Sequence, residues 1–272
     1  MPFAATSRRS ACRGRARGKP EGAALCSPYA GSPTCRPVKD YDEAIRLDPK
    51  DAVTFNNRGL AWYSKKDYDK AIKDYDEAIR LDPKYALTFI NRGRAWGAKK
   101  DYDKAIKDYD EAIRLDPKND WAHFSRSVAR MILRKEKASD GFLKVIDLGG
   151  YKGSLSNYAV ILGFIAASQE ENDERAKRFL KDSAGKLDEA WPYPAVQFLR
   201  GDIDEPALLK LAIDDDKRTE ARCFLGLSHA LKGRKKEALA HFQWVKDHGN
   251  TESLEYGIAI AELERLEAKL KP

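Results

Sequence analysis

The sequence predicts an all-α protein, a solenoid of antiparallel helix pairs that ends in a capping helix. The first indication is the decapeptide Tyr-Asp-Glu-Ala-Ile-Arg-Leu-Asp-Pro-Lys, which occurs at 41–50, 75–84 and 109–118, always 34 residues apart. The second is that apolar residues outside the repeat recur at helical spacing, as they do over 252–270. With 272 residues, of which 42% are hydrophobic and 34% charged, the chain has enough apolar content for a folded core.

A period of 34 residues is the length of a tetratricopeptide repeat (TPR), which folds as a helix–turn–helix unit. The matching positions are Phe55, Gly59, Trp62, Ala71, Tyr75, Ala78 and Pro83 in one repeat, and Phe89, Gly93, Trp96, Ala105, Tyr109, Ala112 and Pro117 in the next. The chain therefore resembles TPR proteins. This resemblance implies a right-handed superhelix in which the first helix of each pair lines an inner groove. One departure is that Arg58 and Arg92 replace the usual Leu at position seven.

The repeated residue types suit two closely packed helices. Gly59 and Ala71 are small enough to let the helices approach, and Tyr75 fills the space between them. Pro83 cannot continue a helix and should end the second one. The acidic and basic residues of the second helix, Asp74 among them, are expected to form a solvated convex face with local ion pairs.

Less regular helices are expected to continue the solenoid. Further pairs are predicted over 120–148, 154–184 and 218–248, with short helices near 195–200 and 204–213. The segment 191–194 interrupts helicity because it contains two prolines. A helix over about 252–270 would cap the solenoid with a polar outer face. The predicted organisation is a disordered basic tail (1–36), a regular TPR array (37–151), and degenerate TPR-like helices with the cap (152–272).

The N-terminal tail carries most of the net positive charge. Residues 1–36 hold seven Lys or Arg residues against one Glu, whereas the remaining 236 residues hold 43 basic and 42 acidic ones. The tail lacks the apolar core of a secretory signal, and no apolar run reaches the length of a membrane span. The cytoplasm is therefore the default compartment. The alternatives are an organelle transit peptide, or a natural N-terminus other than this one that carries a periplasmic signal.

The C-terminal part shows a second pattern. A Trp-led pair of short helices is followed by Phe224-Leu225-Gly226, then by Glu255-Tyr256 and a Glu/Leu-rich helix. This order is similar to the C-terminal part of bacterial NlpI-like TPR lipoproteins, which are adaptors for envelope hydrolases and proteases. The resemblance implies an alternative function, that of an accessory subunit regulating a bacterial envelope or cell-wall enzyme.

Comparison of the two near-identical repeats indicates a binding site. Residues 52–85 and 86–119 differ at six positions, and five of these fall on positions 2, 5, 9, 12 and 13, which face the groove in TPR proteins. Such spacings describe one face of a helix. The five differences are Val53/Leu87, Asn56/Ile90, Leu60/Arg94, Tyr63/Gly97 and Ser64/Ala98, while the sixth groove position is Asn57 or Asn91. We interpret this as a groove that diversified for a ligand; the alternative is that packing tolerates change there.

Two registers are open for the third repeat. Strict 34-residue spacing places Phe124, Val128 and Met131 in the groove and buries the polar His123, Ser127 and Arg130. A slip of one residue buries those three apolar side chains and places Ser125 and Arg126 in the groove. We favour the slip because burial of an unpaired Arg130 is costly. The predicted groove residues are Asn56, Asn57, Leu60, Tyr63, Ile90, Asn91, Arg94, Ser125 and Arg126.

The groove chemistry predicts a polypeptide ligand. Amides such as Asn57 and Asn91 both donate and accept hydrogen bonds, so they can pair with the backbone of an extended peptide. Arg94 would add a cationic anchor for a carboxylate.

Other functions lack support in the sequence. No phosphate loop, dinucleotide fingerprint or nucleophile elbow occurs. The four histidines have no metal-ligand spacing; His241 and Trp244 are expected at the groove or surface, and Cys223 in the core. The nearly neutral body argues against nucleic-acid binding. The prediction is a non-enzymatic adaptor with a protein or peptide partner and no cofactor or metal.

Overall fold

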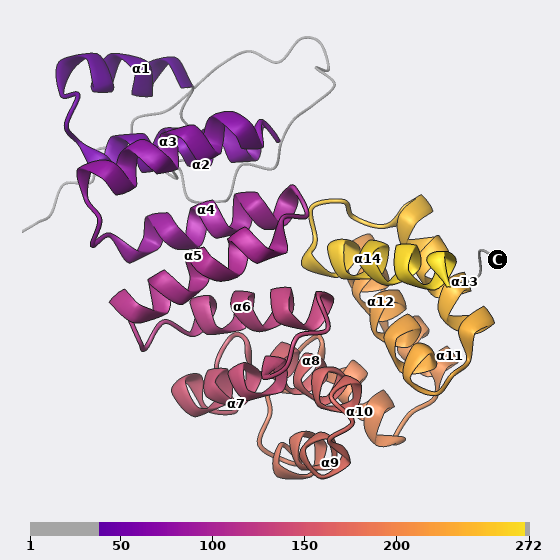
Figure 1. Cartoon of the computed structure of the whole chain (residues 1–272). Helices are drawn as coiled ribbons and strands as arrows, with labels where there is room; N and C mark the ends of the chain where they lie inside the picture. The colour runs from indigo at the N-terminus through magenta and orange to yellow at the C-terminus, as the bar shows by residue number, and fades with distance from the viewer. Residues whose placement is uncertain (1–37, 270–272) are drawn as a thin grey trace, which may run out of the picture.

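The computed structural model describes residues 38–269, and within that range it contains fourteen helices and no strand (Figure 1). In order, the helices are α1 (Val38–Leu47), α2 (Ala52–Ser64), α3 (Tyr68–Leu81), α4 (Ala86–Ala98), α5 (Tyr102–Leu115), α6 (Asp120–Ile132), α7 (Ala138–Gly149), α8 (Ser156–Gln169), α9 (Asp173–Asp182), α10 (Tyr193–Arg200), α11 (Glu205–Leu211), α12 (Asp215–Leu231), α13 (Lys235–His248) and α14 (Leu254–Ala268). The predicted all-α solenoid is confirmed. The predicted disorder of residues 1–36 lies outside the described residues.

Antiparallel pairs form where they were predicted: α2 packs on α3, α4 on α5, α6 on α7, α8 on α9, and α12 on α13. In four of these pairs a glycine of the first helix faces an aromatic ring sixteen residues later. These contacts are Gly59–Tyr75, Gly93–Tyr109, Gly163–Phe179 and Gly226–Phe242. A Cβ atom on any of these glycines would lie 2.3 to 2.7 Å from the nearest ring carbon, so the close approach of the helices requires glycine.

The turn inside each repeat sets the register of the array. Lys66, Lys100 and Arg134 follow α2, α4 and α6 at intervals of 34 residues, and each has a left-handed backbone, with φ of 61°, 63° and 56°. The next helix then begins after Asp67 or Asp101, whose side chains accept hydrogen bonds from backbone N–H groups in the first turn. Because Arg134 keeps the same interval, α6 follows the strict 34-residue register and not the favoured slip.

Ion pairs account for the arginines that replace the usual Leu at position seven. Arg58 forms a two-bond contact with Asp74 on its own second helix, at 2.8 and 2.6 Å, and also reaches Asp42 on α1 at 2.8 Å. Arg92 repeats this arrangement with Asp108 and Asp76. The expectation that Asp74 lies on a solvated face is therefore wrong, because its side chain is buried against a guanidinium.

The main hydrophobic core lies in the second half of the chain. One continuous cluster of buried apolar residues extends from Phe124 on α6 to Leu263 on α14, across the expected boundary at residue 151. The first two repeats are held by smaller separate clusters. Cys223 is fully buried, as predicted.

Helix α14 returns to the first half of the chain. It packs on α12 and α13 and also contacts α6, and Figure 1 shows it beside the turns of the array. Three turn residues form ion pairs with acidic residues at or before α14: Lys66–Glu252 (3.5 Å), Lys100–Glu264 (2.6 Å) and Arg134–Glu262 (2.8 Å). Within residues 38–269, every helix is too short or too polar to cross a membrane.

Candidate protein-binding surface

The first helices of successive repeats line the inner side of the curved stack. Helix α2 contacts α4, α4 contacts α6, and α6 contacts α8, whereas α3 and α5 have no comparable contact. On α2, Gly59 faces Tyr75 of α3, and Phe55, one turn before it on the same side of the helix, is buried. The opposite side of the same helix carries Val53, Asn57 and Leu60, which lie at i, i+4 and i+7. This side is the concave wall.

Exposed apolar side chains follow this wall at the same position of three repeats. Val53, Leu87 and Trp121 occupy the first turns of α2, α4 and α6, and they are 48%, 43% and 53% exposed. Single apolar side chains scattered over a protein surface are common, but large apolar side chains exposed at the same position of three successive repeats form a pattern. The three residues form what we call the apolar stripe.

The predicted amides have different surroundings. The Nδ2 of Asn91 donates to the Oδ1 of Asn56 at 2.9 Å, and these residues are only 4% and 1% exposed. Ile90, another predicted groove residue, is 5% exposed and belongs to the core of the second repeat. Asn57 and Leu60 are half-buried. The amides Asn56 and Asn91 therefore join α2 to α4, and of the predicted amides Asn57 is the one that reaches the surface.

Arg94 and Tyr63 come together from neighbouring repeats. The Arg94 guanidinium lies 5.2 Å from the centroid of the Tyr63 ring, a cation–π contact. Arg94 is exposed, and among residues 38–269 it forms no ion pair with a carboxylate. Beneath it, the hydroxyl of the fully buried Tyr75 has no hydrogen-bond partner, and burial raises the pKa of this phenol above its ordinary value. The arrangement leaves an available cation on the concave wall.

The third repeat departs from the favoured register. Phe124, Val128 and Met131 are buried as expected, yet His123 and Ser127 are buried with them. Ser127 takes the place of Gly59 and Gly93, and its hydroxyl faces Gly141 on α7. The neighbouring Ser125 is half-buried and hydrogen-bonds to Tyr109.

Arg126 is thereby placed outside the groove. It occupies position seven, like Arg58 and Arg92, and its guanidinium pairs with Asp110 on α5 at 2.7 Å. Arg130, which we expected to be costly to bury, is half-buried, with its side chain 23% exposed, and lies 3.8 Å from the same carboxylate. The Arg130 guanidinium, whose costly burial was the reason for favouring the slip, is therefore partly solvated and partly neutralised.

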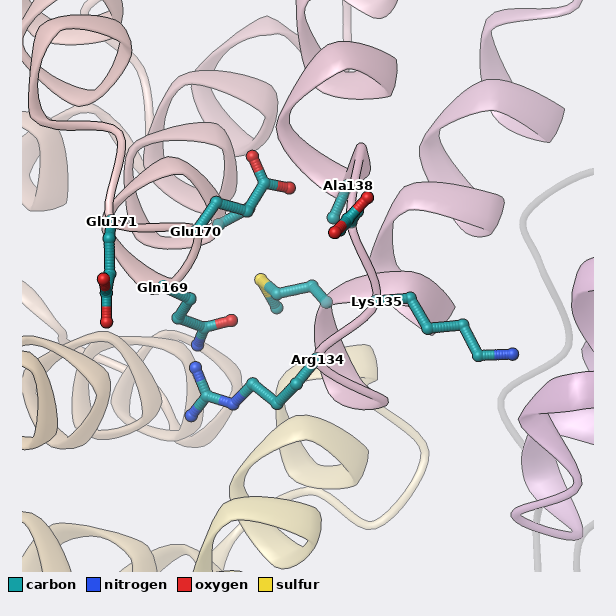
Figure 2. A pocket seen from close by; sticks show the side chains of 9 residues that line it. Arg134, Lys135, Ala138, Gln169, Glu170 and Glu171 are labelled. Carbon is teal, nitrogen blue, oxygen red and sulfur yellow. The ribbon is translucent and has the colours of Figure 1, made fainter.

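A small cavity of about 210 Å³ lies between the α6–α7 turn and the α8–α9 turn. Figure 2 shows the Arg134 guanidinium directed toward Gln169, while the Lys135 side chain points away from Gln169. Three of the five charged residues that line it are already paired: Arg134 with Glu262, Lys135 with Asp103, and Glu170 with Ser139. This cavity is therefore a seam between helix ends in which most of the charged groups have partners within the protein.

A cluster that sequence spacing did not reveal lies in the second half. His229 on α12 and His241 on α13 both face the carboxylate of Glu205 on α11, with Nε2–Oε distances of 3.1 and 3.2 Å. The rings are nearly parallel, at 11°, with centroids 5.3 Å apart. His241 is 4% exposed, so the expectation that it lies at the groove or surface is wrong. Burial, with Arg222 as a further cause, lowers the pKa of His241 to about 4.

Comparison with known proteins agrees with this geometry. Residues 52–85 and 86–119 each match the family model of the tetratricopeptide repeat. A tetratricopeptide repeat protein from Parabacteroides merdae is similar at 14% identity over 82% of this chain and 90% of that chain, with a TM-score of 0.57. YrrB, a TPR protein with an unusual peptide-binding site, is similar at 16% identity over 84% of this chain and 100% of that chain, with a TM-score of 0.51. No curated protein matches.

These findings establish a TPR solenoid with two well-matched repeats. The resemblance of residues 191–266 to NlpI-like lipoproteins stays a prediction.

Proposed function

We propose that this protein is a non-catalytic adaptor that binds an extended segment of another polypeptide along the concave wall of α2, α4 and α6. The observation that carries the proposal is the apolar stripe of Val53, Leu87 and Trp121, exposed at one register position of three successive repeats. Four of the six positions that differ between the two near-identical repeats, 53/87, 60/94, 63/97 and 64/98, are not buried and lie on the same side of the helix. The TPR fold is a scaffold on which such surfaces bind protein partners, and YrrB is one member with a peptide-binding site.

The spacing of the stripe limits the ligand. Packed helices lie about 10 Å apart, so the stripe spans about 20 Å over three helices. A ligand in the extended polyproline II conformation rises about 3.1 Å per residue with three residues per turn, which gives roughly six to seven residues with apolar side chains three residues apart on one face. Arg94, exposed and without a carboxylate partner in residues 38–269, favours a ligand that carries an acidic side chain beside these apolar residues.

Selection from a random dodecapeptide library on the immobilised full chain tests this proposal. Selected peptides should carry two or three apolar residues at that spacing, and Leu87→Asp with Trp121→Ala should weaken binding at least tenfold in fluorescence anisotropy. Arg94→Glu should weaken acidic peptides more than neutral ones. The matched control is Lys73→Glu with Lys107→Glu, which changes two exposed residues on the outer helices α3 and α5.

If the variant Leu87→Asp with Trp121→Ala binds the selected peptides as tightly as the native chain does, groove binding is contradicted. Peptides that bind both equally would then be mapped against the surface around Trp191, where the accessory-subunit alternative places the contact.

A further inference from the structure

The cluster of Glu205, His229 and His241 contains the donor set of a transition-metal site. One oxygen and two imidazole nitrogens from three different helices lie within 4.8 Å of one another. The Nε2 atoms of His229 and His241 lie 3.1 and 3.2 Å from the two different oxygens of the Glu205 carboxylate, close to the roughly 3.3 Å that separates ligand atoms around a tetrahedral ion with bonds near 2.0 Å. Two imidazoles and one carboxylate suit zinc and its neighbours in the first transition row, and they do not suit Mg²⁺ or Ca²⁺, which prefer oxygen.

The surroundings allow an ion to enter and to be held. The Glu205 side chain is 34% exposed, whereas the side chains of His229 and His241 are 10% and 6% exposed, so the cluster opens to solvent on the carboxylate side. The buried Nδ1 of His229 has no hydrogen-bond partner, so no donor prevents this ring from carrying its proton there while Nε2 binds the ion. Three protein ligands leave a fourth tetrahedral position for water.

We propose that Glu205, His229 and His241 bind one divalent transition-metal ion, which ties the short helix α11 to α12 and α13. Helix α11 has seven residues and is too short to be stable alone. Each Nε2 atom can bind the ion only when it carries no proton, so each neutral imidazole then carries its one ring proton on Nδ1.

Arg222 opposes this tautomer. Its Nη1 lies 3.3 Å from Nδ1 of His241, and because a guanidinium can only donate, that Nδ1 must accept. The proton of His241 is thereby held on Nε2, the atom that would bind the metal. The guanidinium also adds a positive charge close to the ion. Replacement of Arg222 by Gln removes the charge and supplies an oxygen that can accept from Nδ1–H.

Zinc titration by calorimetry at neutral pH tests the proposal. The full chain is used with Cys12, Cys26 and Cys35 replaced by Ser, so that these thiols do not compete for the ion. One equivalent of Zn²⁺ should bind in the micromolar range or tighter and raise the melting temperature. His229→Gln and His241→Gln retain a donor toward Glu205 but lose the imidazole, and each should weaken zinc binding at least about tenfold.

Two further variants keep the test decisive if a histidine variant folds poorly. Arg222→Gln should tighten zinc binding about tenfold, whereas Arg218→Gln, an exposed arginine on the same helix, should leave it unchanged. His248→Gln changes an exposed histidine of α13 and should also have no effect. Absence of zinc uptake, equal loss with His248→Gln, or an affinity indifferent to Arg222 would overturn the proposal. None of these outcomes bears on peptide binding by α2, α4 and α6.

Discussion

The carboxyl group of Glu255 makes the stability of the protein depend on pH. It lies at the start of α14, 5% exposed, near the carboxylate of Glu220, which accepts hydrogen bonds from Tyr158 and Trp191. Burial, followed by the charge of Glu220, raises the pKa of Glu255 from 4.5 to about 8. Between these two values the folded chain holds a proton that the unfolded chain has lost, so the free energy of unfolding falls as the pH rises.

The magnitude follows from the size of the shift. Each pKa unit corresponds to about 1.4 kcal/mol, so the native chain should lose roughly 3 to 4 kcal/mol between about pH 5 and pH 8 from this group. Glu255→Gln replaces the carboxyl by a neutral group of the same size. The variant should therefore differ little from the native chain near pH 5 and be more stable near pH 8.

The assay is urea unfolding followed by far-ultraviolet circular dichroism at both pH values. The matched control is Glu267→Gln, an exposed glutamate near the end of the same helix, which should retain the native pH dependence. If Glu255→Gln loses stability between pH 5 and pH 8 as steeply as the native chain, the reasoning is refuted.

Two further predictions concern the repeats. Arg92→Leu leaves the buried Asp108 without its partner and should lower the free energy of unfolding by about 3 kcal/mol, whereas Arg92→Leu with Asp108→Leu should cost much less. A single variant as stable as the native chain would show that the ion pair is dispensable. Gly93→Ala places a Cβ 2.7 Å from the Tyr109 ring and should destabilise by about 1 to 3 kcal/mol. Gly97→Ala, with nothing within 4 Å, should stabilise by about 0.5 to 1 kcal/mol; thermal melts that reverse this order would contradict the packing argument.

The concave wall was predictable in outline and not in detail. The positions that differ between two repeats predict one side of α2 and α4, because helical spacing converts sequence distance into a face, and that side stays a prediction for the binding surface. The sequence could not show that Asn91 bonds to Asn56 across the seam between repeats, since that depends on how closely α2 and α4 approach. The arginine pairs had a readable signal, with Arg58 sixteen residues from both Asp42 and Asp74.

By itself, the sequence determined the helix pairs and the register of the first two repeats, through residue 119, whereas it left two registers open for α6. The contacts that define a repeat join residues about sixteen apart, so a 34-residue pattern contains both partners of each contact, as in Gly59 and Tyr75. Only the tertiary structure decided the return of α14 to the turns at Lys100 and Arg134, and the meeting of Glu205 with two histidines. These contacts join segments that share no repeat, and their geometry follows from the packing of the continuous core between α6 and α14.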